Sequence, residues 1–238
     1  MSDPQNPYAP PTADEVIAID HGGFSYESAA GSAGALKVLL GICLITAAVG
    51  LVSSGLQIGL LGRMDGGGDW TMDEAKANDA REGAIAIIHA LMVLITGIVW
   101  FVWQSRTSKN VRALGAEHME FGPNAWGWFF CPVLNLWRPL QVIRELWVVA
   151  APEPSSGSLD QPAFFAVWWV AWIASGVLSQ ISVRMIGTEA GLEMMIAASW
   201  VDMLSTVATI VSGAAAIKMI GALQARVEAR HARRTAKA

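Results

Sequence analysis

Four apolar stretches constrain this chain most, because each is long enough to cross a lipid bilayer. They run from about 36 to 61, 83 to 104, 163 to 183 and 195 to 217. About 20 apolar residues are needed to cross the roughly 30 Å of hydrocarbon in a bilayer. Open strands would leave backbone amides unpaired in lipid, so the stretches are expected to be helices. The sequence therefore predicts an all-α membrane protein with four transmembrane helices.

The composition agrees with a membrane protein, because charged residues make up only 15% of the 238-residue chain. Soluble domains carry about 25% charged residues. The two cysteines, Cys43 and Cys131, lie in apolar surroundings, which indicates buried thiols and not a disulfide framework. No metal-ligand, nucleotide-binding or catalytic-triad motif occurs, so we expect no metal, no cofactor and no enzymatic activity.

Two tails of opposite charge flank the predicted transmembrane domain, which covers residues 34–222. Residues 1–33 are acidic and Pro-containing and lack the basic and apolar regions of a signal peptide, so we expect a disordered cytoplasmic tail. Residues 223–238 are basic and are expected to bind anionic lipid headgroups, at about 1 kcal/mol per basic residue near the surface. No aromatic or fold signature of nucleic-acid binding accompanies this tail, so no nucleic-acid partner is expected.

The Lys and Arg residues predict the orientation, since basic loops stay on the cytoplasmic side of a membrane. With four spans and a cytoplasmic N-terminus, Arg63, Lys76, Arg81 and Arg184 lie outside, and the other 12 of the 16 basic residues lie inside (16 minus 4). A fifth span from Trp126 to Trp137 would move the basic tail outside. We therefore expect four spans, with both termini in the cytoplasm.

The segment 121–150 lies between the second and third spans and is rich in Trp and Pro. Prolines at 123, 132 and 139 interrupt it, so we expect a partly embedded element that enters the membrane from the inner face. The helix that begins at Pro139 is predicted to be amphipathic, which suits the membrane interface and equally suits packing against the inner end of the bundle. Its apolar side carries Leu136, Leu140, Ile143, Leu146 and Trp147, and its polar side carries Arg138, Gln141, Arg144 and Glu145.

Two residue patterns in this region resemble a known family. One is W-x-x-R-x-x-x-N-x-x-x-L-G, which begins at Trp103, and the other is P-x-x-x-x-W-F-x-x-P-x-x-N-L-W-R-P-x-Q-x-x-R-E-x-W, which begins at Pro123. Together they resemble the bacterial membrane family called domain of unknown function 4328, over about residues 83 to 220. The resemblance implies a bacterial inner-membrane architecture and no agreed activity. The Pro-rich head and the acidic loop that follows the first span are expected to lie outside it.

The polar side of the central element is the leading candidate for an interaction surface. It predicts a non-enzymatic scaffold or sensor that meets a protein partner or lipid headgroups in the cytoplasm. Small residues at four-residue spacing, such as Ser205, Thr209 and Gly213, indicate close helix packing within the chain, with a homo-oligomer as the alternative. The candidate interaction surface consists of Arg106, Asn110, Asn135, Trp137, Arg138, Gln141, Arg144, Glu145 and Trp147.

Polar side chains in the outer half of the predicted spans suggest a second site. Acidic residues inside a membrane are costly and often mark a pathway or a paired site. The candidate outer polar cluster is predicted either to hold a structural Arg184–Asp202 ion pair or to line a cavity for a solute or a proton, which would make the protein a small-solute or ion transporter. Its members are Gln57, His89, Gln180, Arg184 and Asp202.

The start of the second helix is predicted by a T-x-x-E pattern. Thr71 and Glu74 match the capping box, in which the threonine side chain accepts a hydrogen bond from the backbone of the acidic residue. The pattern predicts that a helix begins near Met72 and continues directly into the second span.

Overall fold

The computed structural model describes residues 23–116, 119–152, 161–187 and 191–236, so most of the expected tail 1–33 lies outside the described residues. Within these ranges every regular element is a helix, and four helices are long and apolar enough to cross a membrane. The prediction of an all-α protein with four such helices is confirmed. The elements are α2 (Ala30–Asp65), α3 (Met72–Ala113), the 3-10 helices η1 (Ala125–Phe130) and η2 (Leu134–Leu136), α4 (Arg138–Val149), α5 (Phe164–Met185) and α6 (Leu192–Thr235).

Helix α3 begins where the capping pattern predicts. The Thr71 hydroxyl accepts a hydrogen bond from the backbone N–H of Glu74 at 3.1 Å, which satisfies one of the amides left unpaired at a helix start. The Glu74 side chain does not complete a capping box, because it pairs with Arg63 across the α2–α3 turn. The cap starts the helix ahead of the predicted second span, so α3 contains 42 residues.

Helix α6 extends far beyond the fourth predicted span. The residues expected to form a separate basic tail continue the helix to Thr235. Leu223, Gln224 and Val227 are buried in this extension. Because one side of the extension packs against the rest of the protein, the helix does not end where the membrane-spanning stretch was expected to end.

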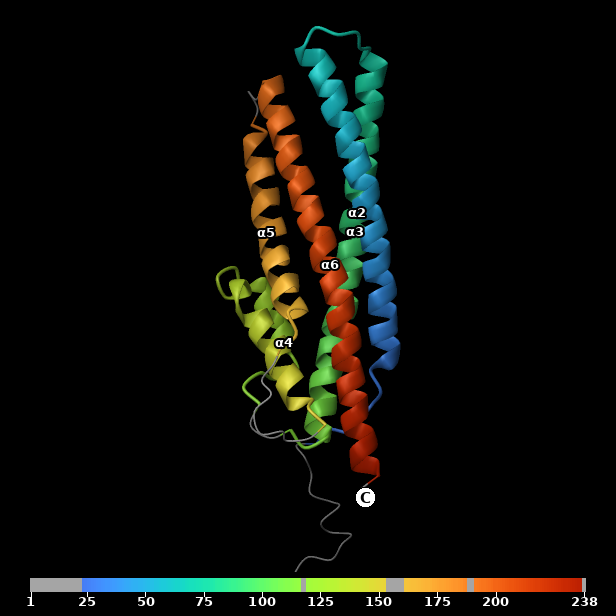
Figure 1. The fold of residues 1–238 in the computed structure, drawn as a ribbon, viewed down its shortest axis with the longest axis vertical. Helices are drawn as coiled ribbons and strands as arrows, with labels where there is room; N and C mark the ends of the chain where they lie inside the picture. The colour runs from blue at the N-terminus through green and yellow to red at the C-terminus, as the bar shows by residue number, and fades with distance from the viewer. Residues whose placement is uncertain (1–22, 117–118, 153–160, 188–190, 237–238) are drawn as a thin grey trace, which may run out of the picture.

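The four long helices pack side by side in the order α3, α2, α6, α5, and α3 and α5 share no extensive contact. Figure 1 shows α4, the start of α2 and the end of α6 towards one end of the bundle, which we call the α4 end. The turn between α2 and α3 lies at the opposite end, which we call the loop end. The backbones of α3 and α5 therefore stay apart, and aromatic side chains such as Trp100 and Trp168, stacked with ring centres 5.4 Å apart, make the contact between them.

Serine side chains join α5 and α6 at regular intervals. The hydroxyls of Ser182, Ser205 and Ser212 donate to backbone carbonyls of the facing helix, at Ala198 (2.9 Å), Ser175 (2.9 Å) and Trp168 (3.1 Å). Positions 168, 175 and 182 of α5 thus meet positions 212, 205 and 198 of α6, at steps of seven residues on both helices. This heptad spacing is typical of two antiparallel helices with a narrow crossing angle, and small residues let their backbones approach.

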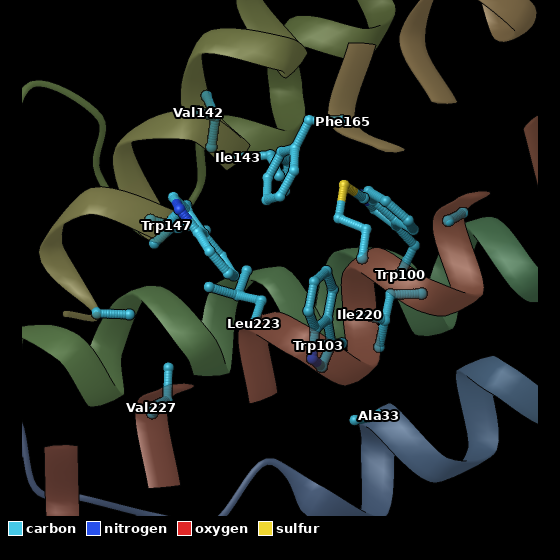
Figure 2. Close-up of a cluster of buried hydrophobic side chains, with 14 of the residues drawn as sticks. Ala33, Trp100, Trp103, Val142, Ile143, Trp147, Phe165, Ile220, Leu223 and Val227 are labelled. Atoms are coloured by element: carbon cyan, nitrogen blue, oxygen red, sulfur yellow. The ribbon is translucent and has the colours of Figure 1, made fainter. Parts of the chain in front are cut away.

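The core of the α4 end binds α4 to the bundle. Figure 2 shows side chains of α3, α4, α5 and α6 pointing towards one another, and Trp103, Ile143, Phe165 and Leu223 are each at most 1% exposed. Burying a large apolar side chain contributes about 1.5–3 kcal/mol. The interior face of α4 therefore packs on protein, while Leu136, assigned to the same apolar side from the sequence, lies in η2 before α4 begins and is 52% exposed.

Candidate functional site

The chain segment that leads into η1 is held by three side chains around Phe121, those of Glu145, Arg112 and Arg138. The backbone N–H groups of Glu120 and Phe121 both donate to the Glu145 carboxylate, the latter at 3.1 Å. Arg112 donates to the Phe121 carbonyl at 2.8 Å. Arg138 pairs with the Glu120 carboxylate at 2.7 Å, and its guanidinium lies 5.3 Å from the centre of the Phe121 ring. Arg138 and Glu145 therefore fix the entrance to the Trp-rich segment.

Asn110 anchors the chain that precedes α2. Its side-chain amide donates to the Glu27 carbonyl at 2.8 Å and accepts from the Glu27 N–H at 3.0 Å. Next to this clamp, the Tyr26 ring stacks on His231 of α6 with ring centres 3.8 Å apart. Burial, and then the nearby Glu228 carboxylate, raise the pKa of the Tyr26 phenol. The N-terminal segment is thus attached to both α3 and α6.

Arg230 joins the C-terminal ends of α3 and α4. Its guanidinium donates to the Leu114 carbonyl at 3.2 and 2.9 Å, and also to the carbonyls of Val149 and Ala151, the latter at 3.3 Å. Carbonyls at helix C-termini lack intrahelical partners and carry partial negative charge, which a cation stabilises. Burial, and then the Arg234 charge, lower the pKa of the Arg230 guanidinium from its ordinary value. The Arg230 guanidinium is therefore a half-buried cationic cap for two helices.

The end of α3 explains why the first pattern finishes with Leu-Gly. Gly115 adopts a φ of +72°, a left-handed conformation that favours glycine. The N–H groups of Gly115 and Ala116 donate to the carbonyls of Arg112 (2.8 Å) and Val111 (2.9 Å), as in a Schellman-type helix end. The turn leaves the Leu114 carbonyl to accept from Arg230.

The structure divides the candidate interaction surface into two groups. Asn110 and Trp147 are buried, Arg138 and Glu145 are bonded internally, and the Oδ1 atom of Asn135 is buried without a hydrogen-bond partner. These residues serve the fold at the α4 end. The residues that remain exposed are Arg106, Trp137, Gln141 and Arg144.

Three members of the candidate outer polar cluster interact with neighbouring helices in the half of the bundle towards the loop end. Gln57 donates to Ser199 at 3.2 Å and accepts from Asn78 at 3.5 Å. His89 contacts the Thr46 hydroxyl through Nδ1 at 3.2 Å. Asp202 is close enough to His89 and Glu82 to interact with both electrostatically. This group draws together α2, α3 and α6.

Gln180 and Arg184 do not join this cluster, and the predicted Arg184–Asp202 ion pair is wrong. Both side chains are exposed, and among the described residues no ion pair joins Arg184 to Asp202. The reason is the rotation of α5. Ser182 faces α6, and positions two residues away lie roughly 200° around a helix of 3.6 residues per turn. Arg184 and Gln180 therefore point away from α6.

Arg81 and Glu82 are members of the outer polar cluster that sequence reasoning missed. Arg81 donates to the Ser53 hydroxyl at 2.7 Å and to the Asn78 side chain, and Ser53 donates to Glu82. The sequence had placed both charged residues at the outer edge of the membrane. The capping pattern at Thr71 was the signal that could have found them, because it starts a helix that carries them towards α2.

Comparison with known proteins covers the region that holds most of these contacts. A family described as Domain of unknown function (DUF4328) matches residues 67–225. The protein belongs to the DUF4328 family. No curated protein and no solved structure matched the chain.

The DUF4328 match is longer than the residue patterns predicted. It begins at residue 67, so it includes most of the acidic loop that was expected to lie outside, together with Arg81 and Glu82 of the outer polar cluster. The Pro-rich head does lie outside the match. Two contacts at the α4 end join a residue outside the match to a residue inside it. Glu27 and Arg230 lie beyond the matched residues, while their partners Asn110 and Leu114 lie within them.

In the part of the chain that the structure describes, no group of three or more His, Cys, Asp or Glu side chains could hold a metal ion.

Proposed function

We propose that this DUF4328 member is a non-enzymatic membrane scaffold or sensor that meets its partner at the α4 end. The observation that carries the proposal is the contrast between the two sides of this region. The interior side is held by Asn110, Glu145 and Arg230, while Gln141 and Arg144 of α4 are exposed. A preorganised surface loses little conformational entropy when a partner binds.

The exposed apolar residues next to α4 support contact with lipid. Phe130 and Val133 are 68% and 64% exposed, and Leu136 and Trp137 are also exposed. Large apolar groups gathered on a surface mark contact with a membrane or a protein, and Trp favours the membrane interface. We infer that η1 and η2 dip into the cytoplasmic leaflet of a bacterial inner membrane and that the polar side of α4 lies at the level of the headgroups.

The orientation follows from the basic residues. Arg63, Lys76 and Arg81 belong to the loop end, whereas Arg226 and Arg230 belong to the α4 end with both described chain ends (Figure 1). The positive-inside rule then favours a cytoplasmic α4 end and two cytoplasmic termini. Homo-oligomers remain compatible with this arrangement, because a partner at the exposed side of α4 could be a second copy.

Cysteine labelling tests both the exposed side of α4 and its orientation in the membrane. The parent for these experiments is a variant in which Cys43 and Cys131 are replaced. Gln141→Cys is expected to react quickly with an impermeant maleimide in purified protein and about tenfold more slowly in inverted native-membrane vesicles, where the partner covers it. Ile143→Cys should react slowly in both preparations, because Ile143 is fully buried. Rates are read from mass shifts. Ala229→Cys, on the exposed side of the α6 extension, is the control and should react equally in both.

Two results would contradict the proposal. Equal reaction of position 141 in purified protein and native membranes would show that nothing covers the exposed side of α4. Reaction of position 141 in right-side-out vesicles would place the α4 end outside the cell.

A second candidate function is proton-coupled or ion transport through the outer polar cluster. The observation in its favour is that Glu82, His89 and Asp202, three titratable side chains, lie near one another in or beside the predicted spans. Buried acids paired with His are common in proton relays of transporters. The apolar lining of the remaining bundle favours the scaffold or sensor as the first candidate.

If the outer polar cluster carries protons, Asp202→Asn should lose proton flux without losing its fold. We expect this variant to lower proton flux into liposomes, followed by an entrapped pH-sensitive dye, by about tenfold while it unfolds within a few degrees of the parent protein. The control is Glu193→Gln, which removes an exposed acid from the first turn of the same helix. Transport is refuted if the parent protein carries no flux above empty liposomes, or if both variants lose flux equally.

A further inference from the structure

A cavity of about 420 Å³ lies inside the bundle, between the outer polar cluster and the α4 end. All four long helices and one residue of η1 line it, among them His89, Thr96 and Trp100 of α3, Trp172 of α5, Ser212 of α6 and Phe129 of η1. Its volume falls in the range of about 300–1,000 Å³ that is typical of small-molecule sites. The scaffold or sensor function does not use this space, and the transport candidate shares only His89 with it.

The packing order leaves one side of the cavity only partly closed. Helices α2 and α6 form its back, since they pack on each other, and α3 and α5 form its sides. The α3 and α5 backbones share no extensive contact, but Trp100 of α3 stacks on Trp168 of α5 with ring centres 5.4 Å apart. The Phe129 ring contacts Trp100 and Trp172 of α5, with ring centres 6.4 and 5.9 Å apart, so these aromatic rings close the α4 end of this side and the opening lies beside them.

The hydroxyl groups in the wall are already satisfied by the protein. Thr96, Thr209 and Ser175 donate to carbonyls of their own helices, at 2.6, 3.0 and 2.8 Å. Ser212 donates to the Trp168 carbonyl of α5 at 3.1 Å. These groups offer little to an ion or a sugar, whose desolvation would cost several kcal/mol without new hydrogen bonds. The wall instead fits a hydrocarbon, with Trp100, Phe129 and Trp172 as its aromatic part.

One hydrogen-bond acceptor remains at the end of the cavity nearest the outer polar cluster. The Thr46 hydroxyl has a single proton, which it donates to the Cys43 carbonyl at 2.9 Å. With that proton on the Cys43 carbonyl, we assign Nδ1 of His89 as the donor to Thr46, which corresponds to the Nδ1–H form of the neutral ring. Nε2 then carries a lone pair that can accept a hydrogen bond from another molecule.

We propose that this cavity binds a long-chain membrane alcohol, with its hydrocarbon between the aromatic walls and its hydroxyl donating to Nε2 of His89. The cavity lies within the predicted spans, so the bilayer itself supplies the ligand. The gap between α3 and α5 admits it sideways, without passage through water. Such a site would let a sensor respond to a membrane lipid. The proposed alcohol binding does not depend on the sensor function, because it rests on the residues that line the cavity.

The test uses two photoreactive probes, hexadecanol and hexadecane, each with a diazirine in the middle of the chain. The full-length protein is reconstituted into vesicles of phosphatidylcholine and phosphatidylglycerol, irradiated, and mapped by peptide mass spectrometry. Hexadecanol is expected to label the α3 and α5 walls saturably and about tenfold more than hexadecane, as one added hydrogen bond to a buried acceptor predicts. If both probes label lipid-facing residues diffusely in the parent protein, that result alone would overturn the proposal.

A pair of glycine variants tests the position of the hydrocarbon. Gly97 lines the cavity from α3, and a Cβ atom there would meet nothing within 4 Å, so Gly97→Leu attaches its side chain without a clash at Cβ and takes up cavity space. Gly176→Leu is the matched control, because Gly176 of α5 is exposed and equally open but does not line the cavity. We expect Gly97→Leu to reduce wall labelling about tenfold and Gly176→Leu to leave it unchanged. Equal labelling of both variants would contradict a chain inside the cavity.

His89→Phe tests the polar end, since it removes the acceptor and keeps an aromatic ring. The preference for hexadecanol over hexadecane is expected to disappear, while hexadecane labelling persists. A preference that survives in His89→Phe would show that His89 does not receive the hydroxyl. Thermal unfolding of each variant, compared with the parent protein, separates these results from a loss of folding.

Discussion

Arg230→Ala is expected to lower the free energy of unfolding by about 2–3 kcal/mol, the typical worth of hydrogen bonds to a charged group. The side chain donates to carbonyls at Leu114, Val149 and Ala151, and alanine would leave these groups without their partner. Because the guanidinium joins α3, α4 and α6, the loss should also loosen α4 from the bundle. Thermal and denaturant unfolding of the purified protein in detergent measure the change.

Two variants separate the geometry of Arg230 from its charge. Lys218→Ala removes a basic residue from an exposed position of the same helix and should change stability by less than about 0.5 kcal/mol. Arg230→Lys keeps the charge but cannot reach the separate carbonyls with a planar fork, so it should restore only part of the stability. If Arg230→Ala and Lys218→Ala unfold alike, Arg230 does not cap these helix ends.

Asn110→Leu is expected to detach the segment that precedes α2. The amide of Asn110 makes both hydrogen bonds to the Glu27 backbone, and leucine of similar size can make neither. Losing them should cost about 1–2 kcal/mol, which raises the detached population roughly five- to thirty-fold. Limited proteolysis near Tyr26 measures this population, because the stack on His231 protects the segment only while it is attached.

The neighbouring residue supplies the control for this experiment. Lys109→Leu makes the same kind of apolar replacement one position earlier, where the side chain is exposed and has no hydrogen bond to Glu27. Cleavage near Tyr26 should stay at the parent rate. Faster cleavage in Lys109→Leu than in Asn110→Leu would mean that the segment is held by something other than the amide clamp.

The sequence predicted the four long helices because crossing a bilayer is a local requirement. Each span needs only its own length and apolarity, and each backbone satisfies its hydrogen bonds within the helix. The start of α3 was also local, since Thr71 caps an amide three residues away. The family resemblance rested on side chains that a short segment displays, such as Trp103 and Asn110.

The partners of those side chains could not be read from the same patterns. Asn110 and Glu145 were assigned to an interaction surface, because a polar residue on a helix looks the same whether it faces water or a distant backbone group. Their hydrogen bonds to Glu27 and Phe121 join residues far apart in the chain. The basic tail 223–238 was assigned to lipid headgroups on the same kind of pattern, and its Arg230 caps the ends of α3 and α4.

What the sequence alone determined is the number, position and helical form of the apolar spans, because hydrophobic length acts within each segment. What only the tertiary structure decided is which side of each helix faces which neighbour. That choice depends on side-chain packing between helices, as in the serine contacts that turn Arg184 away from Asp202 and in the packing order that separates α3 from α5. The cavity follows from the same choice, because it exists only where helices meet in one arrangement and leave one side open.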